Sequence, residues 1–125
     1  MSSRSLLKFA LAVFGTIFLL VYPLAVGWAW HTGAPHDSKY FMMIVGVYAT
    51  LGAFLLMAAR DPQGNRSLIW FTVWSSVVHG AIMAVQSIPA EHHWHLLGDV
   101  PALFLVAGVL GGLLAWSDAE REKAA

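Results

Sequence analysis

The stretch Ser67–Ile88, SLIWFTVWSSVVHGAIMAVQSI, decides how this chain folds. Its length is close to the ~20 residues with which an α-helix crosses the ~30 Å hydrocarbon core of a membrane. Polar side chains nevertheless occur along it, namely Thr72, Ser75, Ser76, His79 and Gln86. Polar groups inside a membrane helix are costly unless neighbouring helices supply partners. The stretch therefore predicts a membrane helix that is packed against other helices.

Three further apolar runs can supply those neighbours. The four runs cover about residues 6–30, 40–59, 67–88 and 100–116, with short polar loops between them. The runs lack the two-residue alternation of a transmembrane β-barrel. Short loops also force consecutive helices to run antiparallel. The sequence therefore predicts an all-α fold, an up-down bundle of four transmembrane helices that forms a single domain over residues 1–125.

The composition agrees with a lipid environment. Hydrophobic residues make up 58% of the 125 residues and charged residues only 11%, whereas about a quarter of a soluble domain is charged. The formal net charge is zero, so there is no argument for nucleic acid as a partner. The chain has no cysteine, which excludes disulfides, thiolate metal sites and cysteine nucleophiles.

Basic residues predict the orientation. Six of the seven fall on one side of a four-span bundle: Arg4, Lys8, Arg60, Arg66, Arg121 and Lys123. The positive-inside rule therefore puts both termini and the 60–66 loop in the cytoplasm. The first run also has the basic start of a signal peptide, but its length and the lack of a convincing cleavage site favour a retained helix. The charged tail, residues 117–125, is expected to fray.

The third run carries the strongest candidate site. Ser75, His79, Met83 and Gln86 share one helical face. We expect His79 to face the bundle interior and to bond with Tyr48, which lies at a similar depth. The opposite face, with Trp70, Val73, Trp74 and Val77, should then meet lipid, and Gln86 and Asp99 should line the outer mouth of the same cavity. The predicted ligand-binding set is His79, Ser75, Ser76, Tyr48, Met83, Gln86 and Asp99.

A less specific interpretation of these polar groups stays open. Serine, threonine and histidine side chains also join membrane helices through hydrogen bonds without binding any ligand. Serine and threonine hydroxyls can simply bond back to carbonyl groups of their own helix.

Metal and haem sites are alternatives. His92, His93 and His95 form a cluster on the predicted outer face, and copper or zinc suits imidazole ligands. Histidine is equally comfortable in an interfacial loop. Haem with two histidine ligands is disfavoured, because His79 has no transmembrane histidine opposite it. Ligation by His79 with Met43 or Met83, or a haem between subunits, stays open.

Small residues recur every four positions in the third and fourth runs, as Ser76/Gly80/Ala84, Ala107/Gly111/Ala115 and Gly108/Gly112. Such rows let helices approach closely, either within the bundle or between copies. The expected partners are thus the lipid bilayer and either a second copy or another membrane protein.

No catalytic motif is found, neither GxSxG, HExxH nor a phosphate loop. We therefore assign no catalytic residue.

Three segments carry a resemblance: YATLGAFLLMAARDP (48–62), SLIWFTVWSSVVHGAIMAVQ (67–86) and HLLGDVPALFLVAGVL (95–110). They resemble a family of uncharacterised small bacterial integral membrane proteins, defined as a domain of unknown function. W-S-S-x-x-H-G (74–80) and G-D-V-P-A (98–102) are the most specific parts. A fainter likeness is to the DoxX-like four-helix membrane proteins, through the general layout. The resemblance implies a bacterial four-helix fold and no particular activity.

Two classes of function follow from the sequence. The first is a non-enzymatic membrane protein that binds a small ligand or a partner subunit within the bundle. The second is a metal- or haem-binding redox or transport component that uses His79 or the 92–95 histidine cluster.

Overall fold

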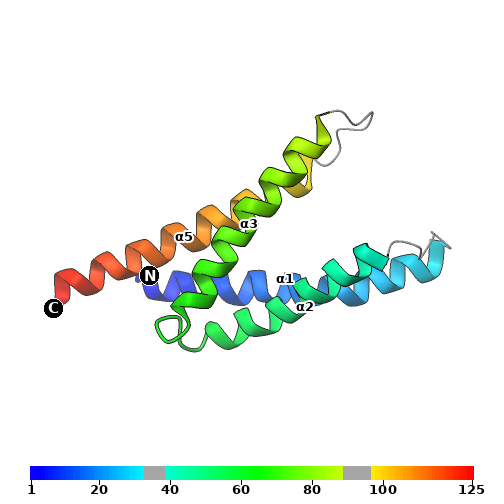
Figure 1. Cartoon of the computed structure of the whole chain (residues 1–125). Coiled ribbons are helices and arrows are strands. Elements are labelled where there is room, and N and C mark those ends of the chain that lie inside the picture. The colour runs from blue at the N-terminus through cyan, green and yellow to red at the C-terminus, as the bar shows by residue number, and fades with distance from the viewer. Residues whose placement is uncertain (33–38, 89–96) are drawn as a thin grey trace.

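A computed structural model describes residues 1–32, 39–88 and 97–125. Four α-helices make up these residues, and no strand occurs among them: α1 (Ser3–Thr32), α2 (Lys39–Ala58), α3 (Arg66–Ser87) and α5 (Asp99–Ala124). Figure 1 shows the chain running up and down through these helices. The predicted all-α four-helix fold is confirmed.

Each of the four helices is long and apolar enough to cross a membrane. Only 22% to 39% of the residues in their apolar windows are buried inside the chain. Large side chains such as Phe9, Phe71 and Trp74 point outward instead. Exposed apolar area on this scale is what lipid-facing helices present, and it is unusual on a soluble monomer.

The helices pair into two hairpins, α1 with α2 and α3 with α5. The hairpins also meet through α1 and α5, whereas α2 and α3 touch over only a short length. Figure 1 shows the hairpins lying together near the two termini and diverging toward the opposite end. We call the first the closed end and the second the open end.

The α1–α2 hairpin is held by a glycine contact that the sequence analysis did not identify. A Cβ atom added to Gly52 would lie 2.6 Å from the carbonyl oxygen of Gly15, and one added to Gly15 would lie 2.9 Å from that of Gly52. No side chain fits at such distances from backbone atoms. The two helices therefore touch backbone to backbone, as small residues allow in membrane helix pairs.

The predicted small-residue seams of α3 and α5 are partly used within the chain. A Cβ atom on Gly80 would lie 3.3 Å from the Phe104 ring, and one on Gly111 would lie 3.4 Å from Val73. By contrast, Gly108 and Gly112 are exposed, and a Cβ atom there would have no neighbour within 4 Å.

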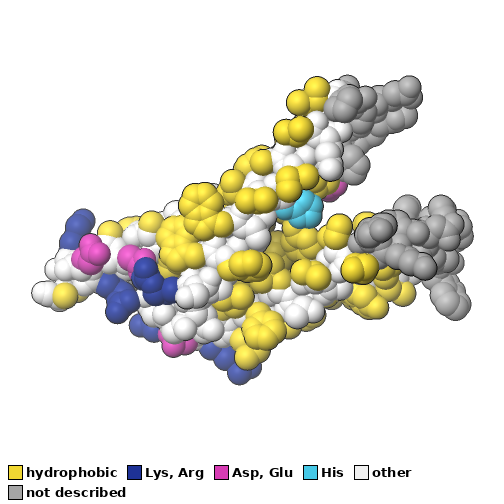
Figure 2. Space-filling view, viewed as in Figure 1, with side chains coloured by type: hydrophobic (Ala, Val, Ile, Leu, Met, Phe, Trp, Pro, Cys, Tyr) yellow, Lys and Arg dark blue, Asp and Glu magenta, His cyan; other side chains and the backbone are white. Residues whose placement is uncertain are grey.

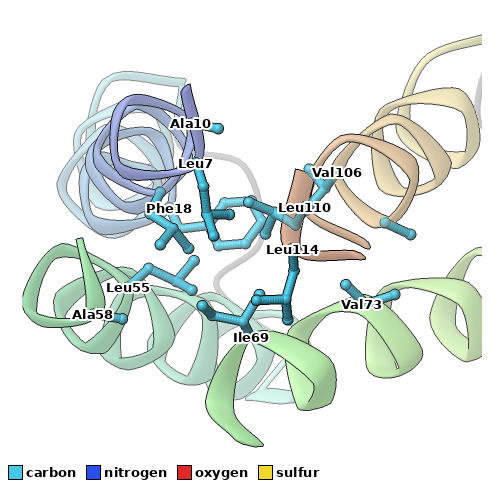
Figure 3. Close-up of a cluster of buried hydrophobic side chains, with 12 residues drawn as sticks. Leu7, Ala10, Phe18, Leu55, Ala58, Ile69, Val73, Val106, Leu110 and Leu114 are labelled. Atoms are coloured by element: carbon cyan, nitrogen blue, oxygen red, sulfur yellow. The ribbon is translucent and has the colours of Figure 1, made fainter. Parts of the chain in front are cut away.

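The apolar core lies at the closed end and draws on all four helices. Figure 3 shows it in close-up. Its fully buried members are Leu7, Leu11, Leu55, Ala58, Ile69, Leu110 and Leu114.

The composition of the core shows that one expectation about the lipid-facing side of α3 was wrong. Val73 is 7% exposed and belongs to the core, while Trp70 and Val77 pack against it. We expected Trp70, Val73, Trp74 and Val77 to face lipid, but of these four only Trp74, at 62% exposure, is exposed. The reason is that α3 turns the face carrying Val73 and Gly80 toward α5, where close packing is possible.

A polar network closes the same end. Arg66 pairs with Asp118, and Ser3 donates to Glu120. Gln63 accepts a hydrogen bond from Arg121 at 2.6 Å and donates one to the Ser117 hydroxyl at 3.2 Å. We call this group the polar clasp; its members are Ser3, Gln63, Arg66, Ser117, Asp118, Glu120 and Arg121.

The polar clasp explains why a second expectation, that of a frayed tail, was wrong. The tail was expected to fray, but α5 continues as a helix to Ala124. Side chains of the N-terminus and of the α2–α3 turn bind the first part of the tail, at Ser117, Glu120 and Arg121. These contacts supply partners that a solvated tail would lack.

Candidate functional site

A cavity of about 430 Å³ lies between α2 and α3. Its wall is mostly apolar, formed by Met43, Ile44, Val47, Leu51 and Phe71. Three polar side chains complete it: Tyr48, Ser75 and His79. Figure 2 shows a histidine in the angle between the two hairpins, surrounded by apolar side chains.

The Tyr48 hydroxyl and His79 Nδ1 lie 2.6 Å apart, within hydrogen-bonding distance. The predicted bond between these two residues is therefore confirmed. The Phe18 ring of α1 packs edge-on against the Tyr48 ring, with centroids 5.2 Å apart. A chain of contacts thus runs from α1 through α2 to α3 and links the two hairpins beside the cavity.

The second ring nitrogen of His79 has no such partner. If the Tyr48 hydroxyl donates to Nδ1, then Nε2 carries the proton and is a donor. If Nδ1–H donates to the Tyr48 oxygen, then Nε2 is an acceptor. In either tautomer Nε2 makes no hydrogen bond within the part of the chain that the structure describes. The half-buried imidazole can therefore offer one donor or one acceptor to a bound molecule.

Hydroxyl groups on α3 behave as the less specific interpretation expected. Ser75 Oγ donates to the Thr72 carbonyl oxygen at 3.2 Å, and Thr72 Oγ1 donates to the Leu68 carbonyl oxygen at 2.9 Å. Ser75 still lines the cavity. Ser76 does not: it is 2% exposed and lies on the face of α3 that carries Gly80 toward α5.

Three further predicted site residues lie away from the cavity. Met83 and Gln86 follow His79 on α3 but do not line it, and Gln86 is exposed. Asp99, the first residue of α5, is exposed and does not line it either. The expected shared mouth of Gln86 and Asp99 is therefore not part of this cavity. The hairpins diverge toward the end of α3 and the start of α5, where these two residues lie (Figure 1).

The apolar wall is the part of the site that the sequence analysis missed. Met43, Val47 and Leu51 follow one another at four-residue intervals on α2, and Phe71 faces them from α3. The four-residue interval places the three α2 residues on one side of that helix. This four-residue repeat of apolar residues next to Tyr48 was the sequence signal from which the wall could have been predicted.

The metal predictions have different outcomes. His92, His93 and His95 lie outside the described residues, so the outer-face cluster stays a prediction. Among the residues that are described, no three His, Asp or Glu side chains come together to hold a metal. Met43 shares the cavity with His79, whereas Met83 does not line it.

Comparison with known proteins places the chain in a family without assigning it a role. No curated protein and no solved structure matches the chain. Residues 1–124 match DUF6632, which is described as a family of unknown function. Because the match spans nearly the whole sequence, the chain belongs to the DUF6632 family.

Proposed function

We propose that this protein binds a neutral, membrane-borne small molecule in the cavity between α2 and α3, and that it does so without catalysis. The observation that carries the proposal is the environment of His79. Its Nδ1 is bonded to Tyr48, its Nε2 has no partner among the described residues, and the rest of the wall is almost entirely apolar. Ligand sites in proteins typically combine such a wall with a few convergent polar groups.

The proposal includes a location. We place the four helices in a bacterial inner membrane with both termini in the cytoplasm. The two termini and the α2–α3 turn lie at the same end of the molecule, where Arg66 and Arg121 belong to the polar clasp. Basic residues concentrate on the cytoplasmic side of membrane proteins. This arrangement supports the orientation expected from the sequence.

The depth of His79 favours a neutral ligand. Along α3, the residue lies roughly 12 Å from Ser87 at 1.5 Å per residue. A charged group at such a depth is expensive. The group that meets Nε2 is therefore a carbonyl or a hydroxyl, since Nε2 donates in one tautomer and accepts in the other.

The ligand reaches the cavity from the bilayer. Met43, Ile44 and Phe71 line the cavity and are themselves exposed on the outer surface. The cavity is therefore open to the surface between the hairpins.

The test compares purified wild-type protein with His79→Leu, both reconstituted in nanodiscs. Mass spectrometry of the organic extract should show a neutral molecule retained by the wild-type protein and depleted in His79→Leu. Thr72→Val is the matched control, because its hydroxyl also lies on α3 but bonds only to the Leu68 carbonyl. Circular dichroism checks that all three proteins keep their helices. Equal amounts of the same molecules in all three extracts would contradict the proposal.

One observation favours a second candidate, a haem-binding redox or transport component. Met43 and His79 line the same cavity, as ligation by histidine and methionine would need. The His79 Nδ1 bond to Tyr48 also resembles the outer-shell bond of a metal-bound histidine. A visible absorption band lost in both Met43→Leu and His79→Leu would support this candidate. A colourless protein, prepared from haem-supplemented cells, would exclude it.

A further inference from the structure

The proposed function leaves the class of ligand open. A groove beside the cavity indicates which class of ligand fits. Resting on that function, we infer that the ligand is a lipid with a small neutral head and one apolar chain. The head bonds His79 Nε2, and the chain lies in a groove that runs along α2 and α3 toward the closed end.

The groove adjoins the cavity and has a volume of about 610 Å³. Four residues line both spaces: Met43, Val47, Leu51 and Phe71. Because they share this wall, the two spaces form one continuous channel on the surface between the hairpins. The groove carries the channel onward to Phe54 on α2 and Leu68 on α3.

The chemistry changes along this channel. At one end stand His79, Tyr48 and Ser75. In the groove, the only polar side chain among the described lining residues is Thr50, and its hydroxyl already donates to the Gly46 carbonyl oxygen at 3.0 Å. The groove thus offers nothing to a polar group and only packing to a hydrocarbon chain. One polar end and one apolar end match an amphiphile laid lengthwise.

The length fits a single lipid chain. From His79 to Leu68 the channel follows α3 for roughly 16 Å at 1.5 Å per residue. An extended dodecyl chain is of this order. The channel takes one chain, and the apolar groove between α1 and α5, which includes Phe9 and Val109, shares no lining residue with it.

The direction also agrees with a lipid. In the proposed orientation, the head lies toward the outer side and the chain points toward the cytoplasm, which is the head-to-tail direction of an outer-leaflet lipid, with the whole molecule sunk deeper in the bilayer. The head is sunk roughly 12 Å below the end of α3 by the helical rise. Phospholipids cannot place a charged phosphate there cheaply, whereas a fatty alcohol or another uncharged lipid can.

Gly46 provides a specific way to block the groove. It lines the groove, and a Cβ atom added there would have no neighbour within 4 Å. Gly46→Leu therefore places a side chain in the groove whose Cβ atom meets no protein atom. Gly112→Leu is the matched control, because it makes the same change at an equally open helical position on α5, outside the channel.

The experiment uses two photoreactive dodecanols with the full-length protein in phosphatidylcholine vesicles. One carries a diazirine beside the hydroxyl and the other at the chain end, and crosslinked peptides are mapped by mass spectrometry. The head probe should label residues around His79, and this labelling should be lost in His79→Leu. The tail probe should label residues around Phe54 and Leu68. Its labelling should fall about tenfold in Gly46→Leu, the order expected from overpacking an occupied site, and stay unchanged in Gly112→Leu.

The outcomes separate the two claims. If the head probe labels the His79 region but the tail probe labels elsewhere, or Gly46→Leu behaves as Gly112→Leu does, the chain site is wrong and the ligand cavity stands. If the head probe does not label the His79 region, or labels it equally in His79→Leu, both the cavity and the chain site are wrong.

Discussion

The closed end and the open end of the bundle use polar residues in opposite ways. At the closed end, the polar clasp joins side chains that satisfy one another, as when Gln63 bonds both Arg121 and Ser117. Where the hairpins begin to diverge into the open end, Tyr48 bonds only one nitrogen of His79 and leaves the other without a partner in the described chain. The difference indicates that the closed end maintains the fold, whereas the open end can bind something else.

If the helix contacts near the closed end maintain the fold, crowding them should cost the most. We expect Gly52→Val to lower the free energy of unfolding by about 3 kcal/mol, because its side chain would meet the Gly15 carbonyl and the Leu19 backbone nitrogen. The measurement is unfolding in mixed micelles followed by circular dichroism. Gly46→Val on the same helix has open space and serves as the control. Equal stabilities of the two variants would show that the close α1–α2 contact is unimportant.

Removing core volume at the closed end should have the next largest effect. Leu114→Ala is expected to cost about 2 kcal/mol, near the lower limit for buried leucines, because the unfolded helices stay in lipid rather than water. Leu105→Ala on the same helix, where the side chain is exposed, should cost much less. Both are measured by the same unfolding assay. A larger loss for Leu105→Ala would place the stabilising contacts elsewhere.

The polar clasp should stabilise the tail more than the bundle. Gln63→Ala removes the partners of Arg121 and Ser117, and we expect it to destabilise the last turns of α5 by about 1 kcal/mol. Hydrogen exchange of the α5 amides after Asp118 should accelerate, while amides near Leu110 keep their protection. Unchanged exchange beyond Asp118 would mean that the tail is helical without the clasp.

The smallest effect on stability is expected at the open end. Tyr48→Phe removes the bond to His79 but keeps the ring against Phe18, so it should cost only about 0.6 kcal/mol, the average for hydrogen bonds between membrane helices. The same variant should retain less ligand, because the imidazole is no longer held in place. A loss of stability as large as that of Leu114→Ala would show that the pair is mainly structural.

The sequence predicted the elements and one contact across the bundle. Four spans followed from the bilayer thickness, and the Tyr48–His79 bond followed from matching depths on two helices. Periodicity did not predict which neighbour each face of α3 meets. Membrane helices are apolar on all sides, so no polar face fixes their rotation. The rotation of α3 is set instead by close packing, such as Gly80 against Phe104 and Val73 against Gly111.

The tail and the α1–α2 contact were missed for related reasons. A charged segment such as 117–125 is ordinarily left to solvent, and only the fold brings Gln63 and Ser3 beside it. Neither Gly15 nor Gly52 has a small residue four positions before or after it, so nothing in either helix alone marks the two as a pair. Both features depend on contacts between distant parts of the chain.

The divergence of the two hairpins has a consequence for the membrane itself. In a bilayer, the molecule has a wider cross-section in the leaflet around its open end than in the other leaflet. The angle between the hairpins is lined by exposed side chains such as Met43 and Ile44. Acyl chains must fill that angle. At this level, lipid takes the place that the leucines of the core take at the closed end, and the composition of that leaflet becomes one of the determinants of the protein's shape.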